Sequence, residues 1–125
     1  MEILKFMLIA GTGGFVGTCC RFLINRLFLS FWKLPFPLAT FTINILGCFI
    51  FGIIIGILSK QGGIDPKINA LLIVGFCGGF TTFSTFSFES FSLASNGEFL
   101  ISFVYISASV IAGFLAIWLA FYLTR

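Results

Sequence analysis

Four long apolar stretches, separated only by short polar segments, constrain this chain more than any other feature. They are residues 3–32, 37–59, 68–95 and 99–124. A bilayer core about 30 Å thick requires about 20 mainly apolar residues per helix, so each stretch is long enough to cross it. The second and fourth contain no charged residue, while the first contains Lys5 near its start and is interrupted by Arg21 and Arg26, and the third contains Glu89. The sequence therefore predicts an all-α integral membrane protein with four transmembrane helices in one domain, residues 1–125.

Composition excludes a water-soluble domain. Hydrophobic residues make up 59% of the chain and charged residues 9%, against roughly 45–50% and 25% in globular domains. The N-terminal run MEILKFMLIAGTGG has the look of a secretory signal, but we interpret it as the start of a retained helix. The net charge of +3 and the scattered basic residues exclude a nucleic-acid-binding surface.

Metal and redox motifs are also missing. The chain has no histidine, and its four cysteines show no metal-ligand spacing; they are Cys19, Cys20, Cys48 and Cys77. We interpret them as small apolar residues that fill space.

The connecting segments carry the turn-forming and charged residues. They are 33–37 (KLPFP), 60–67 (KQGGIDPK) and 95–98 (SNGE). Four spans put both termini on one side, together with four basic residues: Lys5, Lys60, Lys67 and Arg125. The other side has Lys33 and Arg26, with Arg21 deeper in its span. A bias this small does not fix orientation. We therefore expect insertion in both directions and an antiparallel homodimer with its two-fold axis in the membrane plane.

Small and polar residues recur at helical spacing. Gly13 and Gly17, and Gly52 and Gly56, lie four apart and predict close helix packing. Polar residues form two faces, which are Thr40 with Asn44, and Ser102 with Tyr105 and Ser109. An asparagine at mid-span either joins helices or contacts a ligand, and its spacing does not decide between the two.

The third stretch contains GFCGGFTTFSTF, residues 75–86. We expect Gly78 and Gly79 to break its helix and to release carbonyl groups that a cation would accept. The alternative is a simple kink whose backbone groups are paired by Thr81 or Thr82. Phe83 and Phe86 lie three apart, and their ring edges carry the positive side of the aromatic quadrupole, which suits an anion.

Three segments resemble the Fluc (CrcB) family of microbial fluoride channels, and the likeness spans almost the whole chain. They are GGFVGTCCRF (13–22), TINILGCFIFG (42–52) and above all GFCGGFTTFSTFSFE (75–89). The resemblance implies an antiparallel dual-topology homodimer with two fluoride pores and a broken third helix. It also implies a structural sodium ion at the dimer interface, held by the backbone carbonyls of Gly78 and Thr81 from each subunit.

The resemblance assigns the pore as well. It implies that fluoride meets the residues Asn44, Phe83, Phe86, Tyr105 and Ser109, with Ser84 and Thr85 as companions. Arg21 is expected near an aqueous vestibule and Glu89 near the pore. Two positions depart from the family pattern, because Thr18 replaces a common Ala and Cys48 replaces a frequent Ser or Thr. A thiol at position 48 puts a hydroxyl contact there in doubt.

The leading hypothesis is a non-enzymatic, fluoride-selective channel that exports cytoplasmic fluoride across the inner (plasma) membrane of a microbe. The partners expected are fluoride, lipid and a second copy of the chain. One alternative is a small four-helix multidrug-type antiporter, which needs a carboxylate at the centre of the first span, where this chain has only Glu2 at the end. The other is a membrane scaffold that transports nothing.

Overall fold

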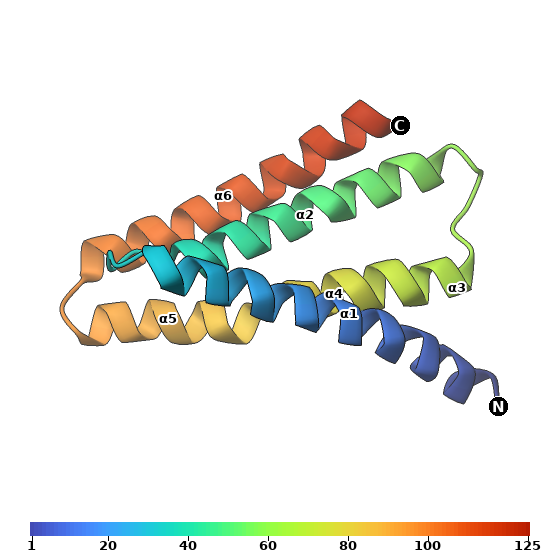
Figure 1. The fold of residues 1–125 in the computed structure, drawn as a ribbon. Coiled ribbons are helices and arrows are strands. Elements are labelled where there is room, and N and C mark those ends of the chain that lie inside the picture. The colour runs from blue at the N-terminus through green and yellow to red at the C-terminus, as the bar shows by residue number, and fades with distance from the viewer.

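The computed structural model describes residues 1–125, and almost all of them are helical (Figure 1). The elements are α1 (Glu2–Phe31), α2 (Leu38–Ser59), α3 (Pro66–Ile68), the π-helical segment η1 (Asn69–Cys77), α4 (Gly78–Phe80), α5 (Phe83–Ser95) and α6 (Phe99–Thr124). Elements α3 to α5 together form one membrane-length unit, Pro66–Ser95. With α1, α2 and α6, this unit gives four helices long and apolar enough to cross a membrane. The predicted four-helix organisation is confirmed.

The helices pack in two main pairs. α2 runs along α6, while α1 crosses η1 and α4 (Figure 1). α5 continues the third span beside the N-terminal half of α6. The two termini lie at the same end of the molecule in Figure 1, as an even number of spans requires.

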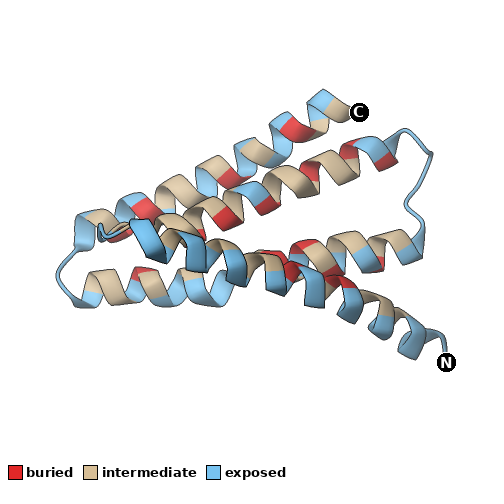
Figure 2. Ribbon diagram, in the orientation of Figure 1, coloured by how far each residue is buried: buried red, intermediate tan, exposed pale blue.

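The surface of the bundle is apolar. Only 17 of the 125 residues are buried, and they follow the seams between helices (Figure 2). Large apolar side chains such as Phe15, Phe103 and Phe114 are exposed along the outer faces. An apolar exterior on helices of membrane length identifies a multi-pass membrane protein.

Glycines bring helix backbones together where the sequence predicts it. A Cβ on Gly52 would lie 2.6 Å from the carbonyl oxygen of Ile117, so α2 and α6 approach too closely there for any other residue. A Cβ on Gly17 would lie 2.9 Å from the backbone nitrogen of Phe80. The small-residue seams predicted in the first two spans are therefore confirmed.

The third span is broken, but not at the position that we expected. Gly78 has helical dihedral angles (φ −64°, ψ −37°), and Gly79 lies in α4. The chain becomes extended three residues after Gly78, at Thr81 (φ −81°, ψ 159°) and Thr82 (φ −146°, ψ 119°). The prediction that Gly78 and Gly79 themselves break the helix is wrong.

Close packing accounts for Gly79. A Cβ there would lie 2.6 Å from the carbonyl oxygen of Gly14, so Gly79 lets α1 cross the third span at its last turn. The helix ends beyond this crossing, because backbone groups of Thr82 are paired with another helix instead of with its own.

Candidate functional site

The break is held open by Asn44 of α2. Its Oδ1 accepts a hydrogen bond from the backbone N–H of Thr82 at 2.8 Å, and its Nδ2 donates to the Thr82 carbonyl at 3.1 Å. An amide side chain thus replaces both of the helical partners that Thr82 lacks. One amide hydrogen of Asn44 is left for another acceptor, because an amide nitrogen carries two.

The helix restarts directly after the break. The hydroxyl of Thr82 accepts a hydrogen bond from the Thr85 N–H at 3.3 Å and caps α5. Before the break, the N–H and the hydroxyl of Thr81 both donate to the Cys77 carbonyl, at 3.0 and 2.9 Å. These contacts close the last turn of α4 and open the first turn of α5.

Two carbonyls at the break lose their helical donors. The Thr82 N–H, which would reach Gly78 in a continuous helix, is taken by Asn44. The Thr85 N–H, which would reach Thr81, is taken by the Thr82 hydroxyl. Gly78 is exposed, so its backbone can be approached from outside the chain.

A third carbonyl is covered by α1. The Nε of Arg21 donates to the Gly79 carbonyl at 3.0 Å, and the Thr18 hydroxyl lies 3.5 Å from the same oxygen. Arg21 is half-buried. Its positive charge stands at the C-terminal end of the η1–α4 helix, where it complements the helix dipole.

An open groove of about 280 Å³ lies beside the break. Its lining, called the Asn44 groove below, consists of Asn44, Cys48, Thr81, Thr82, Phe83, Phe86, Ser109 and Val110. These residues come from α2, the break, α5 and α6. No full charge lines the groove, and its polar groups are an amide, a thiol and three hydroxyls.

Ser109 contributes an unpaired hydroxyl to this groove. Its hydroxyl oxygen is buried and has no hydrogen-bond partner in the chain. A hydroxyl left without a partner at membrane depth is unfavourable unless a ligand or water completes it.

Phe83 and Phe86 lie on the same wall of the Asn44 groove. Their ring centroids are 6.1 Å apart and the planes are inclined by 43°. Phe83 is 79% exposed, whereas Phe86 is half-buried and packs on Tyr105 at 5.1 Å. Phe83 is therefore fixed by few contacts within this chain, while Phe86 is fixed by Tyr105.

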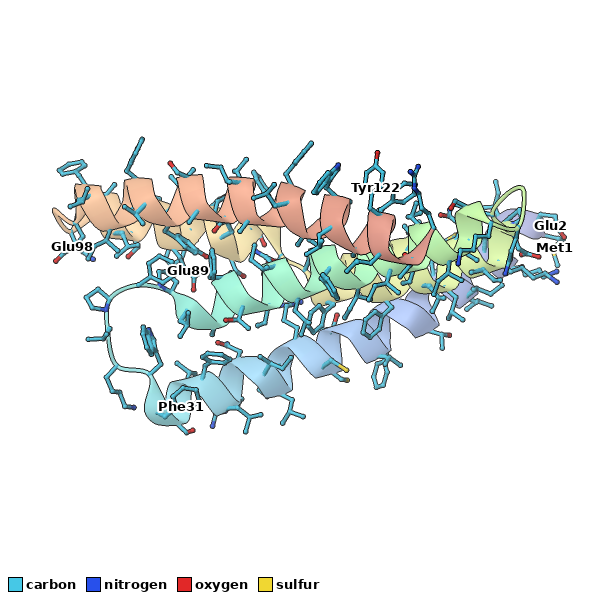
Figure 3. The ribbon with its side chains drawn as sticks, turned by 90° about the horizontal axis from the view of Figure 1, so that it is seen from above. Met1, Glu2, Phe31, Glu89, Glu98 and Tyr122 are labelled. Carbon is cyan, nitrogen blue, oxygen red and sulfur yellow. The ribbon has the colours of Figure 1, made fainter.

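Glu89 is held inside the bundle one turn beyond Phe86. Its Oε1 accepts from the Tyr105 hydroxyl at 2.9 Å, and its Oε2 accepts from the Thr40 hydroxyl at 3.1 Å. Figure 3 shows Glu89 between the helices, whereas Glu2 and Glu98 lie at opposite ends of the molecule. Tyr105 is fully buried, so its hydroxyl is committed to the carboxylate.

A second cavity, of about 300 Å³, opens at the far side of Glu89. It lies under the loop between α1 and α2, where Asn25, Trp32, Phe36 and Ser92 contribute to its wall. Glu89 lines this cavity and Phe86 lines the Asn44 groove. The two hollows are therefore separated by a single turn of α5.

The structure brings together only some of the residues that the sequence singles out. Asn44, Phe83, Phe86, Ser109 and Thr81 share the groove. Tyr105 and Glu89 pair with each other one turn away, and Arg21 lies behind the break on Gly79. Ser84 and Thr85 are exposed on α5 outside the groove lining.

Two residues were not assigned a site role from the sequence. Thr82 is the partner of Asn44 and the cap of α5, whereas the sequence named it only as one of two threonines that could pair backbone groups at a kink. Thr40 holds Glu89, and its position four residues before Asn44 placed it on the correct face.

No group of three His, Cys, Asp or Glu side chains lies close enough to hold a metal ion. The oxygens open to a hard cation at the break are the backbone carbonyls of Gly78 and Thr81, which have lost their helical donors.

Comparison with known proteins agrees with this architecture. Residues 8–121 match the family model described as CrcB-like protein, Camphor Resistance (CrcB). A protein of Azobacteroides pseudotrichonymphae is 41% identical over 123 residues, covering 98% of both chains, and is named fluoride-specific ion channel FluC. A protein of the same name from Flavobacterium psychrophilum is 40% identical over 92% of this chain and 93% of its own. Another from Gloeothece citriformis is 41% identical over 100% of this chain and 98% of its own.

The family model covers nearly the whole chain, including α2, the third span with its break, and most of α1 and α6. The chain belongs to the CrcB family.

Proposed function

We propose that this chain is a fluoride-selective channel that carries fluoride passively out of the cytoplasm and so gives fluoride resistance. Its family and the fluoride-channel name of its relatives support this function. The observation that carries the site is the unpaired Ser109 hydroxyl, which lines the same groove as Asn44 and the two phenylalanines.

The groove offers a small anion several weak partners and no strong one. Ser109 has a free hydroxyl, Asn44 has one spare amide hydrogen, and Phe83 and Phe86 present rings whose edges are positive. No basic side chain lines the groove. An anion would therefore be bound enough to enter and loosely enough to leave, which conduction requires.

The path that we infer follows α5. Fluoride would move from the Asn44 groove past Phe86 to Glu89 and into the cavity under the α1–α2 loop. Both oxygens of Glu89 already accept hydrogen bonds from Thr40 and Tyr105, which spreads its charge before an anion passes.

The membrane potential supplies the driving force. Hydrogen fluoride crosses membranes as a neutral molecule and ionises at neutral pH, so fluoride accumulates inside a cell in an acidic medium. Moving one charge through 100 mV is worth about 2.3 kcal/mol, which drives the anion outward without a coupled pump. This function places the protein in the plasma membrane of the cell.

The functional unit that we infer is an antiparallel homodimer. Gly78 is exposed and Phe83 is 79% exposed, and both lie at the break in the third span. A second copy related by a two-fold axis in the membrane plane would cover these residues and wall the open side of the groove.

The same two-fold axis would bring four carbonyl oxygens together, those of Gly78 and Thr81 from each subunit. The fit rests on the hydrogen bonds at the break, because the helical donors of both carbonyls are diverted, to Asn44 and to the Thr82 hydroxyl. Carbonyl oxygens suit a small hard cation, so sodium would neutralise their dipoles and join the subunits. Purification with caesium in place of sodium should then lower the flux and the stability of the dimer.

Ion efflux from liposomes tests the function. The purified chain should release fluoride and hold back chloride under the same gradient, whereas liposomes without protein release neither. An antiporter would instead require a proton gradient, and a scaffold would release no ion. Either result would overturn the proposal.

A further inference from the structure

Two thiols from different elements line a small cavity beside the break, and the proposed channel function assigns neither thiol a role. The cavity measures about 170 Å³ and is lined by Cys48 of α2 and Cys77 of η1. Both cysteines are free. They are 29 positions apart in sequence (77 − 48), so only the packing of α2 against the third span brings them to one wall.

The backbone around the cavity holds both thiols in place. A Cβ on Gly47, the residue before Cys48, would collide with the side chain of Thr81, so α2 lies directly against the break. The Cys48 sulfur would lie 3.3 Å from a Cβ on Gly113, and the absence of that Cβ leaves room for the sulfur beside α6. Cys77 is 3% exposed, and its carbonyl is fixed by two hydrogen bonds from Thr81.

The chemistry of this wall selects a particular class of ion. Apart from the two thiols, the only polar side chain of the lining is Thr81, whose hydroxyl is already committed to the Cys77 carbonyl, and Gly78 contributes backbone only. Thiolates favour soft metal ions over hard ones such as sodium or magnesium. Two thiols that bind one divalent ion lose two protons, and the product is neutral. A neutral complex has a far lower desolvation cost at membrane depth than a charged one.

We propose that Cys48 and Cys77 form a two-thiolate site for a soft divalent ion of the mercuric type, and that its occupation stops flux through the adjacent groove. Each sulfur forms one bond to the metal and releases one proton, with no change in oxidation state. Cys48 and Thr81 line the Asn44 groove as well as this cavity. A bound ion would therefore tie α2 to the last turn before the break.

The metal-binding half is tested without any measurement of transport. The C19S/C20S variant keeps Cys48 and Cys77 as its only cysteines. Cys19 and Cys20 line neither the Asn44 groove nor the cavity of the proposed pair. In chloride-free buffer with mercuric nitrate, we expect one metal per chain, the loss of both free thiols together, and retention during washing with a monothiol. C48S in the same background should lose this retention. C77S should do the same, and C77A repeats the test with an apolar side chain if C77S does not fold.

Three results would overturn the site: two metals per chain, unchanged retention after either single substitution, or metal-linked pairs of chains on a denaturing gel. The inhibitory half rests on the proposed function and is tested in liposomes. Mercuric ion should abolish fluoride efflux in C19S/C20S, and excess dithiol should restore it. C77S, or C77A if C77S does not fold, should show no inhibition, and Cys77 does not line the Asn44 groove. Undiminished efflux from chains that hold the metal would overturn that half alone, whereas absent efflux before metal is added would count against the proposed function.

Discussion

Asn44 of α2 forms two hydrogen bonds with the backbone of Thr82: its Oδ1 accepts from the N–H at 2.8 Å, and its Nδ2 donates to the carbonyl at 3.1 Å. The pair crosses from one span to another at membrane depth. It explains how an extended segment can exist there, because a side chain supplies the partners that a helix would otherwise provide.

The first prediction concerns this pair. Asn44→Leu would leave the N–H and the carbonyl of Thr82 unpaired, at about 1–3 kcal/mol for each group. We expect both a lower melting temperature and a severe loss of fluoride flux. Leu46→Ala, 40% exposed on the same helix and outside the groove lining, is the control and should change flux little. If Asn44→Leu kept its melting temperature while losing flux, Asn44 would act on the ion alone.

The second prediction separates the two phenylalanines. Phe83→Ile should abolish or sharply reduce flux with little change in stability, because Phe83 makes few contacts within the chain and isoleucine lacks the quadrupole. Phe86→Ile should also reduce flux, and it should lower stability by about 0.5–1.5 kcal/mol through the lost ring contact with Tyr105. Phe91→Ile, 67% exposed on the same helix, is the matched control. Full flux in both groove variants would remove the rings from the path.

The third prediction compares two serines of α6. Ser109 has an unpaired hydroxyl, whereas the Ser102 hydroxyl donates to the Ser90 carbonyl at 2.8 Å. Ser109→Ala should lower flux about tenfold, the effect of one charge-assisted hydrogen bond of about 1.5 kcal/mol, without loss of stability. Ser102→Ala should lower the free energy of unfolding by about 1 kcal/mol. Liposome flux and thermal unfolding in detergent measure both quantities, and the reverse pattern would contradict the assignment.

The fourth prediction concerns the Glu89 carboxylate. Tyr105→Phe removes the hydroxyl donor to Oε1 and should lower the stability of the fold by about 1.5–3 kcal/mol, the range for a hydrogen bond to a charged group. Flux should fall as well, because Glu89 would lose one of its two fixed donors. Tyr122→Phe is the control, since Tyr122 is 48% exposed and lies near the C-terminal end of α6, whereas Tyr105 lies near its N-terminal end. Equal behaviour of the two variants would show that the Tyr105 hydroxyl does not matter.

The fifth prediction tests orientation in the membrane. Gln61 lies in the exposed loop between α2 and α3, so Gln61→Cys in the C19S/C20S background presents one accessible thiol. A membrane-impermeant maleimide should label this thiol from both sides of the membrane in comparable amounts. The reason is the thin difference in basic residues between the two sides. Labelling from one side only, in chains that still conduct, would exclude the antiparallel dimer.

Much of the fold was predictable because a bilayer imposes a length and a polarity on each helix. Four apolar stretches of sufficient length predicted four spans, and glycines four residues apart predicted the seams at Gly17 and Gly52. The faces that carry Thr40 with Asn44, and Ser102 with Tyr105, follow from helical spacing alone. These features depend on residues that are close in sequence.

Only the tertiary structure decided where the third span breaks and which side chains pair. Gly78 and Gly79 permit a break, but both remain helical, and α1 packs closely against Gly79. The chain opens at Thr82, because Asn44, 38 residues away, offers both a donor and an acceptor to its backbone. The meeting of Cys48 and Cys77 at one cavity likewise depends on how α2 packs against the third span. Such pairings join residues far apart in the chain. A pattern of residue types describes only neighbours in sequence, so it cannot predict which distant residues will meet.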